Sequence, residues 1–394
     1  MAEWQTVRLG EMVKTNQSTY SPKENWQFVN YLDTGNITMN KIDEIQNINT
    51  AKDKLPSRAR RKVKTNSIIY STVRPNQLHY GIIKKQPDNF LVSTGFTVID
   101  VNYDKAVPDF IYYALTKQEV TEQLQAIAEQ SVSAYPSLKP SDIENLELML
   151  PDKKTQERIV AILRSIDEKI KENNAINNNL EQQAQAVYYK MFSEVNTVPV
   201  ELSSIIDVRD GTHDSPKAQA TGYYLITSKH LLPFGVDKAS ANHISKADFD
   251  KINERSLVET QDILMSMIGT IGLISYIPYE TVDFAIKNVA LFKTSHTPEL
   301  AYYFLCYLKS EKTLQHIGKC LAGSTQKYIS LGELRKMPIY SPTANEIREF
   351  NCLVKPMFEK IVSRTYENAL LAEMRDSLLP KLMSGELDVS NIEL

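Results

Sequence analysis

Two stretches of the chain repeat apolar residues at alternating spacings of four and three. The first series comprises Ile159, Leu163, Ile166, Ile170, Asn173, Asn177 and Leu180. A second series follows at a constant offset and comprises Phe350, Val354, Met357, Ile361, Arg364, Asn368 and Leu371. This spacing places successive residues on one side of a helix and is typical of the contact seam of a coiled coil. The pattern therefore predicts two long amphipathic helices.

The two seams share a polar interruption near the middle. Asn173 and Asn177 in the first series occupy the same places as Arg364 and Asn368 in the second. A buried polar layer lowers stability but can fix the register and orientation of a helix pair. Two helices of similar length with polar centres fit an antiparallel pair, in which the centres meet. The alternative, two unrelated surface helices, leaves the matched interruption unexplained.

The segments that precede the two helices also match each other. Residues 66–71 align with 261–266, and residues 108–113 align with 298–303. Each half begins with β-branched and aromatic runs that predict strands, and continues with a helix that starts at a proline and an acid. The strands are expected at 68–73, 90–99, 263–267 and 284–292, and the helices at 109–128 and 298–317.

This order of elements predicts an α+β protein in which two similar domains are joined by two long antiparallel coiled-coil helices, with a pseudo-twofold internal repeat. Its symmetry should bring the two chain ends close together. The expected segments are a first domain at 1–151, a central helical spacer at 152–195, a second domain at 196–342 and a distal helical spacer at 343–394.

The composition predicts where the protein is found in the cell and says less about its function. The 394 residues suffice for two cores, and 42% hydrophobic with 24% charged residues is ordinary for a soluble protein. The start of the chain has no signal-like segment, and no apolar run approaches the length of a membrane span. The three cysteines are odd in number and lack metal-ligand spacing. These features predict a cytoplasmic protein with free thiols.

The net charge of −3 does not indicate a nucleic-acid binder, because such proteins usually carry a basic balance. One local basic cluster stands out, and it contains Arg58, Arg60, Arg61 and Lys62. Such a run is also common on a solvated protein surface.

Several motifs resemble the specificity subunit of type I restriction-modification systems, and the likeness extends over nearly the whole chain. The C-terminal Leu-Pro-Lys-Leu-Met-Ser-Gly-Glu-Leu (379–387) is similar to the end of that family, and 189–192 is its internal counterpart. Residues 151–159 resemble the entry into the central helix. Residues 207–216 and 322–329 resemble motifs of the recognition domains.

The resemblance implies that each domain reads one half of an interrupted site in double-stranded DNA. The helices, each of about 35–40 residues and about 50–60 Å, would be a spacer longer than one DNA turn of about 34 Å. They would dock two methyltransferase (M) subunits and, in the nuclease complex, restriction (R) subunits. S-adenosylmethionine and ATP are expected on those partners, and this chain is expected to bind no cofactor. The loop at 131–137 departs from the pattern because it lacks the counterpart of Gly323.

The chain lacks motifs for chemistry of its own. There is no Asn-Pro-Pro-aromatic segment, no glycine-rich loop that opens a helix and no Gly-x4-Gly-Lys-Ser/Thr phosphate loop. The six histidines do not have the spacing of metal ligands. We therefore expect no catalytic residue and no metal site.

DNA contacts are expected to divide into phosphate contacts, which position the protein, and base contacts, which specify the sequence. The phosphate candidates are Arg58, Arg60, Arg61 and Lys62 in the first half and Lys229, Lys287, Lys327, Ser324 and Thr325 in the second. The base-edge candidates are Arg74, Gln77, His79, Tyr80, Arg209, Asp210, Thr212 and His213, with Asn288 and Gln326 as helpers. The same segments also fit ordinary surface turns.

Three other functions remain open on the sequence alone. A coiled-coil scaffold whose heads bind proteins agrees with the near-neutral charge. A fused restriction and methylation enzyme would need the catalytic motifs that are absent. A stand-alone DNA-binding regulator is the third alternative. It is less favoured, because no segment of the chain resembles a helix-turn-helix.

Overall fold

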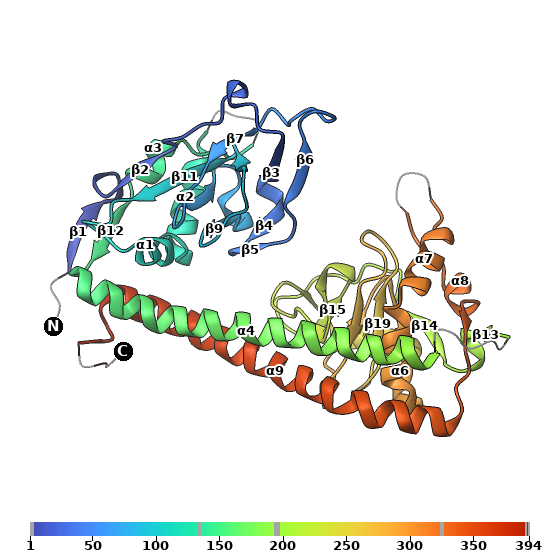
Figure 1. Ribbon diagram of the computed structural model, residues 1–394. Coiled ribbons are helices and arrows are strands. Elements are labelled where there is room, and N and C mark those ends of the chain that lie inside the picture. Colours follow the sequence, from blue (N-terminus) through green and yellow to red (C-terminus); the bar gives the residue numbers. More distant parts are fainter. Residues whose placement is uncertain (1–3, 132–134, 193–197, 324–326, 391, 393–394) are drawn as a thin grey trace. The chain divides into compact units, whose positions relative to one another are not determined.

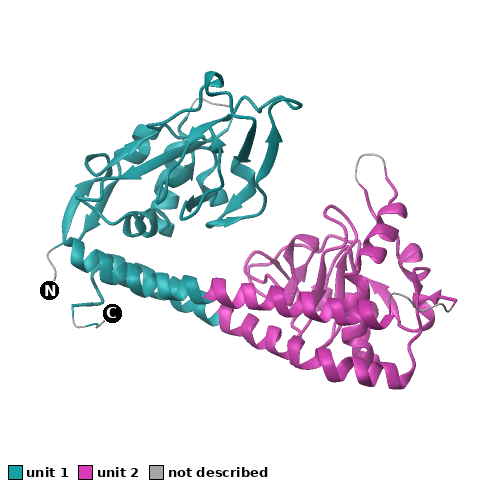
Figure 2. Cartoon of the chain, viewed as in Figure 1, with its two compact units in different colours: residues 1–169, 370–394 teal, residues 170–369 magenta. Residues whose placement is uncertain are grey.

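The computed structural model describes residues 4–131, 135–192, 198–323, 327–390 and 392. Contacts divide the chain into two compact units (Figure 2). Unit 1 comprises Met1–Lys169 and Leu370–Leu394, and unit 2 comprises Ile170–Ala369. Leu382 and Met383 are buried in the core of unit 1, and Trp4 packs against the same core. Both ends of the chain therefore belong to one unit, as the internal repeat predicts.

Unit 1 contains two four-stranded sheets (Figure 1). The sheet β2-β11-β8-β9 is antiparallel throughout, and the sheet β6-β3-β10-β7 contains the parallel pair β3 and β10. Every residue of β8 and β10 is buried, which explains why these strands are apolar runs and do not alternate with polar residues. The elements are β1 (Gln5–Arg8), β2 (Val13–Thr15), β3 (Phe28–Leu32), β4 (Ile37–Thr38), β5 (Lys41–Ile42), β6 (Gln46–Asn49), β7 (Ala59–Lys62), β8 (Ile68–Ser71), β9 (Tyr80–Ile82), β10 (Phe90–Ser93), β11 (Phe96–Val101), β12 (Glu147–Leu150), α1 (Pro108–Leu115), α2 (Gln118–Glu129) and α3 (Pro140–Glu144).

Unit 2 has the antiparallel sheet β14-β22-β19-β20 and the sheet β18-β15-β21, in which β15 and β21 are parallel. The elements are β13 (Val200–Glu201), β14 (Val208–Asp210), β15 (Tyr223–Ile226), β16 (Leu231–Leu232), β17 (Gly235–Val236), β18 (Asn242–Ile244), β19 (Ile263–Ser266), β20 (Ile274–Tyr276), β21 (Phe284–Ile286), β22 (Val289–Phe292), β23 (Pro338–Ile339), α5 (Lys246–Ser256), α6 (Ala301–Leu308), α7 (Glu311–Lys319) and α8 (Leu331–Arg335).

The two units repeat one topology and differ in one connection. Phe96 of β11 pairs with Ser71 of β8, as Val289 of β22 pairs with Ser266 of β19. The predicted duplication is therefore confirmed. The connection that leads to β8 forms the strand β7, whereas the connection that leads to β19 forms the helix α5. The second sheets of the two units consequently end in different elements.

Two expectations about strands were wrong. The runs at 90–99 and 284–292 were each expected to be one strand, but each forms two strands that belong to different sheets. Asn288 adopts a positive φ of 53° between β21 and β22, which breaks the extended backbone. An unbroken apolar run does not reveal such a change of sheet, because both strands are buried.

The helices at 109–128 and 298–317 were also expected to be continuous. The first is divided into α1 and α2 because Lys117 adopts an extended backbone. The second is divided into a 3-10 turn (Pro298–Leu300), α6 and α7. α7 begins anew at Ser310, whose hydroxyl accepts a hydrogen bond from the backbone N–H of Thr313 at 3.2 Å.

The two long helices are α4 (Lys153–Phe192) and α9 (Ala344–Ser384). Within unit 2, Asn173 contacts Asn368, whereas the ring of Phe192 packs on that of Phe350 with centroids 5.4 Å apart. Rising residue numbers on α4 therefore meet falling numbers on α9, which confirms the antiparallel pair. In unit 1 the same two helices are linked by Arg375 and Asp167, 3.0 Å apart.

The polar interruptions of the two seams meet in unit 2. Asn173 is fully buried, and its amide donates hydrogen bonds to Asn368 Oδ1 at 2.9 Å and Glu367 Oε2 at 2.8 Å. Asn368 donates in turn to Asn174 Oδ1 at 2.9 Å. The remaining seam residues are buried or half-buried. The buried ones are Ile159, Leu163, Ile166, Phe350, Val354 and Ile361, and the half-buried ones are Ile170, Asn177, Leu180, Met357, Arg364 and Leu371.

Both long helices begin with a side-chain cap after a proline. Asp152 precedes α4 and accepts hydrogen bonds from the backbone N–H of Thr155 at 3.0 Å and from its hydroxyl at 2.8 Å. Thr343 and Glu346 cap α9 reciprocally. The hydrogen bonds from Thr155 hold the pKa of the Asp152 carboxyl below 3.8.

Replacing Asp152 with alanine is expected to lower the free energy of unfolding by about 1 kcal/mol above pH 5, because one cap is lost. A lowered pKa contributes stability above the unfolded value of 3.8, and this contribution disappears as the pH falls through the folded value. The two proteins should therefore converge at low pH in urea unfolding followed between pH 6 and pH 3. Asp152→Asn keeps a capping oxygen that does not titrate, so above pH 5 it should lose less stability than Asp152→Ala. Equal losses in the two variants would contradict the assignment.

Candidate nucleic-acid interface

The hairpin between β8 and β9 presents Arg74 on the surface of unit 1. Arg74 and Leu78 flank a 3-10 turn (Pro75–Gln77) and have positive φ values of 48° and 57°. The guanidinium lies over the ring of Tyr135, 4.9 Å from its centroid. The backbone N–H of Arg74 also donates to Pro136 O at 3.1 Å. These contacts hold an exposed cation in one place, and Gln77 beside it is exposed as well.

The other two hairpin candidates have structural partners. His79 Nδ1 lies 2.6 Å from Ile37 O, so one ring nitrogen is engaged within the unit. Tyr80 is only 4% exposed and stacks on Tyr70 with ring centroids 5.6 Å apart. Burial raises the pKa of Tyr80 to about 12. Its side chain cannot reach DNA, so the prediction that Tyr80 reads a base is corrected.

The basic cluster of unit 1 lies along β7 and the residue before it. Arg58 is exposed, whereas Arg60, Arg61 and Lys62 are half-buried. Lys62 pairs with Glu24 and lies 5.1 Å from the centroid of the Trp26 ring. The hydrogen bond from Lys62 lowers the pKa of Glu24. Lys62 is therefore partly neutralised, and Arg58 is the most accessible cation of the four.

In unit 2 a hydrogen-bonded network extends from the end of β14 to α5. Asp210 is 8% exposed, and its carboxylate accepts a hydrogen bond from Arg255 Nη2 at 3.1 Å. The other oxygen of Asp210 lies 3.0 Å from His213 Nε2, and His213 Nδ1 lies 2.8 Å from Asn288 Oδ1. Both oxygens of Asp210 are thus engaged. It positions Arg255 and His213, and a contact of Asp210 itself with a base stays a prediction.

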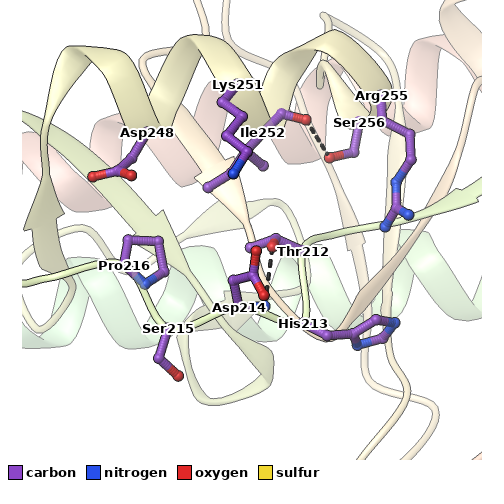
Figure 3. A pocket seen from close by; sticks show the side chains of 10 residues that line it. All are labelled: Thr212, His213, Asp214, Ser215, Pro216, Asp248, Lys251, Ile252, Arg255 and Ser256. Atoms are coloured by element: carbon purple, nitrogen blue, oxygen red, sulfur yellow. Dashed lines mark hydrogen bonds between the residues drawn. The ribbon is translucent and has the colours of Figure 1, made fainter.

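This network borders a cavity of about 380 Å³ between α5 and the loop that follows β14 (Figure 3). Its basic side chains are Lys251, Arg255 and His213, and its hydroxyls include those of Thr212 and Ser215. Asp214 and Asp248 also line it, so the lining has mixed charge. The full lining is Thr212, His213, Asp214, Ser215, Pro216, Asp248, Lys251, Ile252, Arg255 and Ser256.

The remaining candidates of unit 2 lie at several places. Arg209 pairs with Asp207 at 2.7 Å. Thr212 and Lys287 form an isolated bridge, and the Lys287 ammonium contacts the hydroxyl of Ser215. Lys229 and Lys327 are exposed. Ser324, Thr325 and Gln326 lie outside the described residues.

Comparison with known families identifies the family to which the chain belongs. Two segments, 1–182 and 195–350, match the family model described as type I restriction modification DNA specificity domain. The chain belongs to this family. It supplies the DNA specificity of a type I restriction-modification system, and its two family matches fall on the two halves of the duplication.

Curated relatives in the family align over most of their length. The specificity subunit of the type I restriction enzyme HindI from Haemophilus influenzae is 26% identical, over 98% of this chain and 100% of that protein. The specificity subunit of the enzyme MjaIX from Methanocaldococcus jannaschii is 25% identical, over 79% of this chain and 76% of that protein. The solved structure of a type I restriction-modification S subunit from M. genitalium is 16% identical over 97% of this chain and 96% of that chain, with a TM-score of 0.53. The last comparison supports the fold.

Three exposed side chains of this family member were missed by sequence reasoning. Lys251 and Arg255 were overlooked because α5 has no counterpart in the first half, so the repeat did not predict it. The start of α5 could have been found from the sequence, because Ser245 and Asp248 have the spacing of a helix cap. In the structure the Ser245 hydroxyl accepts a hydrogen bond from the backbone N–H of Asp248. Tyr135 was missed because nothing in its local sequence indicates that it meets Arg74.

The structure adds two findings on other classes of site. Within the described ranges, no group of three or more His, Cys, Asp and Glu side chains could hold a metal ion. None of the helices in those ranges is sufficiently long and apolar to span a membrane.

Proposed function

We propose that this specificity protein reads a DNA site in two parts, one part with each globular head, and performs no catalysis itself. The observation that carries the proposal is the double family match on two heads with unlike surfaces. Unit 1 presents a basic strand, β7, where unit 2 presents the helix α5 with Lys251 and Arg255. Different side chains select different bases, so the two half-sites should differ.

We assign phosphate contacts to Arg58, Arg60, Arg61 and Lys62 in unit 1. The corresponding set in unit 2 is Lys229, Lys251, Lys287 and Lys327. Base contacts are assigned to Arg74 and Gln77 in unit 1 and to Arg209, Thr212, His213 and Arg255 in unit 2, with Asn288 as a positioning partner of His213. Cations near phosphates should make binding weaken steeply with salt.

The partners follow from the names of the relatives, which are specificity subunits of type I restriction enzymes. We propose that two methyltransferase subunits bind the helical spacers 152–195 and 343–394, while 1–151 and 196–342 are the recognition domains. Restriction subunits join in the nuclease complex. S-adenosylmethionine and ATP would bind to these partners. The methyltransferase would flip an adenine presented in each half-site.

The test is to map methylated adenines in the host genome with and without this gene. We expect a bipartite motif with a fixed non-specific gap that is lost on deletion and restored by complementation. Exchanging residues 1–151 for those of another family member should then change one half-site alone. If deletion leaves every methylated motif in place, the proposal is wrong.

A further inference from the structure

The hairpins that join β8 to β9 and β19 to β20 share one backbone plan. Ser71 N–H donates to His79 O, and Ser266 N–H donates to Leu273 O. Two positions after each serine an isolated bridge follows, Val73 with Ser137 and Ile268 with Tyr328. With Ser71 matched to Ser266, Arg74 stands at the position of Gly269. With His79 matched to Leu273, Leu78 stands at the position of Gly272.

All four of these residues have positive φ. The values are 48° for Arg74 and 57° for Leu78, against 78° for Gly269 and 85° for Gly272. Glycine adopts this conformation without steric cost, whereas the Cβ of any other L-residue crowds the backbone. Unit 2 therefore has glycine, which the turn favours, at both positions. Unit 1 has a strained non-glycine residue at each of them.

Packing explains one of the two strained residues. Leu78 is half-buried against the core of unit 1, so its side chain contributes apolar contacts. Arg74 is exposed and makes no such contribution. Among the described residues, its guanidinium has no hydrogen-bond or ion-pair partner; it stacks on Tyr135, which is 59% exposed. Stacking occupies the flat face of a guanidinium and leaves the donors at its edge directed outward.

We infer that Arg74 reads a guanine in the half-site bound by unit 1, and that Tyr135 positions it. An arginine donates two hydrogen bonds to O6 and N7 of guanine in the major groove, which no other base accepts in the same way. The strained backbone and the aromatic ring fix the direction of the guanidinium before DNA binds. This inference rests on the proposed function and adds the base to it. Unit 2, with Gly269 at this position, lacks the contact.

The decisive variant is Arg74→Gly, which gives unit 1 the residue of unit 2 and relieves the backbone, so that misfolding is not expected. The chain is co-expressed with its methyltransferase partner, and adenine methylation is measured on a DNA library randomised over the wild-type motif. We expect one G·C position of one half-site to become degenerate, with the preference for guanine falling about ten- to one-hundredfold. The other half-site should stay unchanged.

Two outcomes would overturn the inference. One is an unchanged preference for guanine at every position, and the other is a uniform loss of methylation on all sites, which indicates a phosphate contact. The matched control is Asn89→Gly, another position of positive φ in unit 1, which should leave the motif intact. If the wild-type chain directs no methylation at all, the proposed function fails, and this outcome is distinct from both.

Tyr135 offers an independent readout of positioning. Tyr135→Ala removes the ring below the guanidinium and should weaken the preference for guanine at the same base pair that Arg74→Gly affects. Tyr135→Phe keeps a cation–π partner and should retain it. A loss of preference at a different base pair, or an equal loss in both Tyr135 variants, would contradict the positioning role.

Discussion

Replacing Lys293 with methionine is expected to lower the free energy of unfolding of unit 2 by about 3–5 kcal/mol. The Lys293 side chain is 1% exposed, and its ammonium donates to Asp262 Oδ2 at 2.6 Å, Glu259 Oε2 at 2.7 Å and Leu257 O at 3.0 Å. Asp262 is 0% exposed, so loss of the lysine leaves a buried carboxylate without its counter-charge. Removing one partner of such a pair is costly even where the intact pair adds little.

Hydrogen exchange of the amides in β19 and β22 measures this effect within unit 2. The matched control is Lys246→Met. Lys246 pairs with Asp250 at 2.7 Å, but both side chains are more than half exposed, so the expected loss is much smaller than for Lys293→Met. Equal losses in the two lysine variants would show that Asp262 does not depend on Lys293 for its charge balance.

The corresponding place in unit 1 shows that the fold itself does not require the buried lysine. The strand pairing places Ser67 where unit 2 has Asp262, and Asp100 where unit 2 has Lys293. Ser67 donates a hydrogen bond to Asp100 at 2.6 Å. The acid has therefore changed strands between the two halves. Asp100 is half-buried and also lies 3.7 Å from the Lys64 ammonium, so unit 1 balances its carboxylate without a buried lysine.

Replacing Phe350 with alanine is expected to cost about 3–5 kcal/mol in unit 2, because it opens a cavity where α4 and α9 meet. Phe350 is 0% exposed. Its ring packs edge-on against Phe192 and Tyr188, with centroid distances of 5.4 Å and 6.4 Å. The surroundings of a closely packed ring relax only partly when it is removed, so most of the cavity should remain.

Urea unfolding of the full chain measures this loss. Leu353 lies on the same helix but is 53% exposed, so Leu353→Ala should change stability by no more than about 0.5 kcal/mol. A small effect of Phe350→Ala would mean that the helix pair does not depend on this aromatic cluster.

Several features of the fold followed from the sequence because they depend on short-range pattern. The seams of α4 and α9 repeat every few residues, so Ile159 or Phe350 could be assigned to a contact face without knowledge of the partner. Residues 151–159 resembled the entry into the central helix, and α4 begins at Lys153. The shared polar interruption predicted the contact that Asn173 and Asn368 make.

Other features required partners from distant parts of the chain. The run at 90–99 is uniformly apolar, and only the neighbouring strands decide that Phe90–Ser93 and Phe96–Val101 join different sheets. The helix α5 was not predicted, because the first half has the strand β7 at the corresponding place. A duplication predicts what its copies share, and not the connections in which they differ.

For the candidate interface, the sequence determined which residue types could contact DNA, and the tertiary structure decided which of them are accessible. Tyr80 begins β9, one residue beyond the hairpin, and the alternation of strand faces turns it into the core. Asp210 is nearly buried and accepts a hydrogen bond from Arg255, which lies far along the chain. Arg74 remained a candidate, but its stacking on Tyr135 and its likeness to Gly269 became visible only in the folded hairpins. Side-chain direction depends on long-range packing, and local sequence carries little information about it.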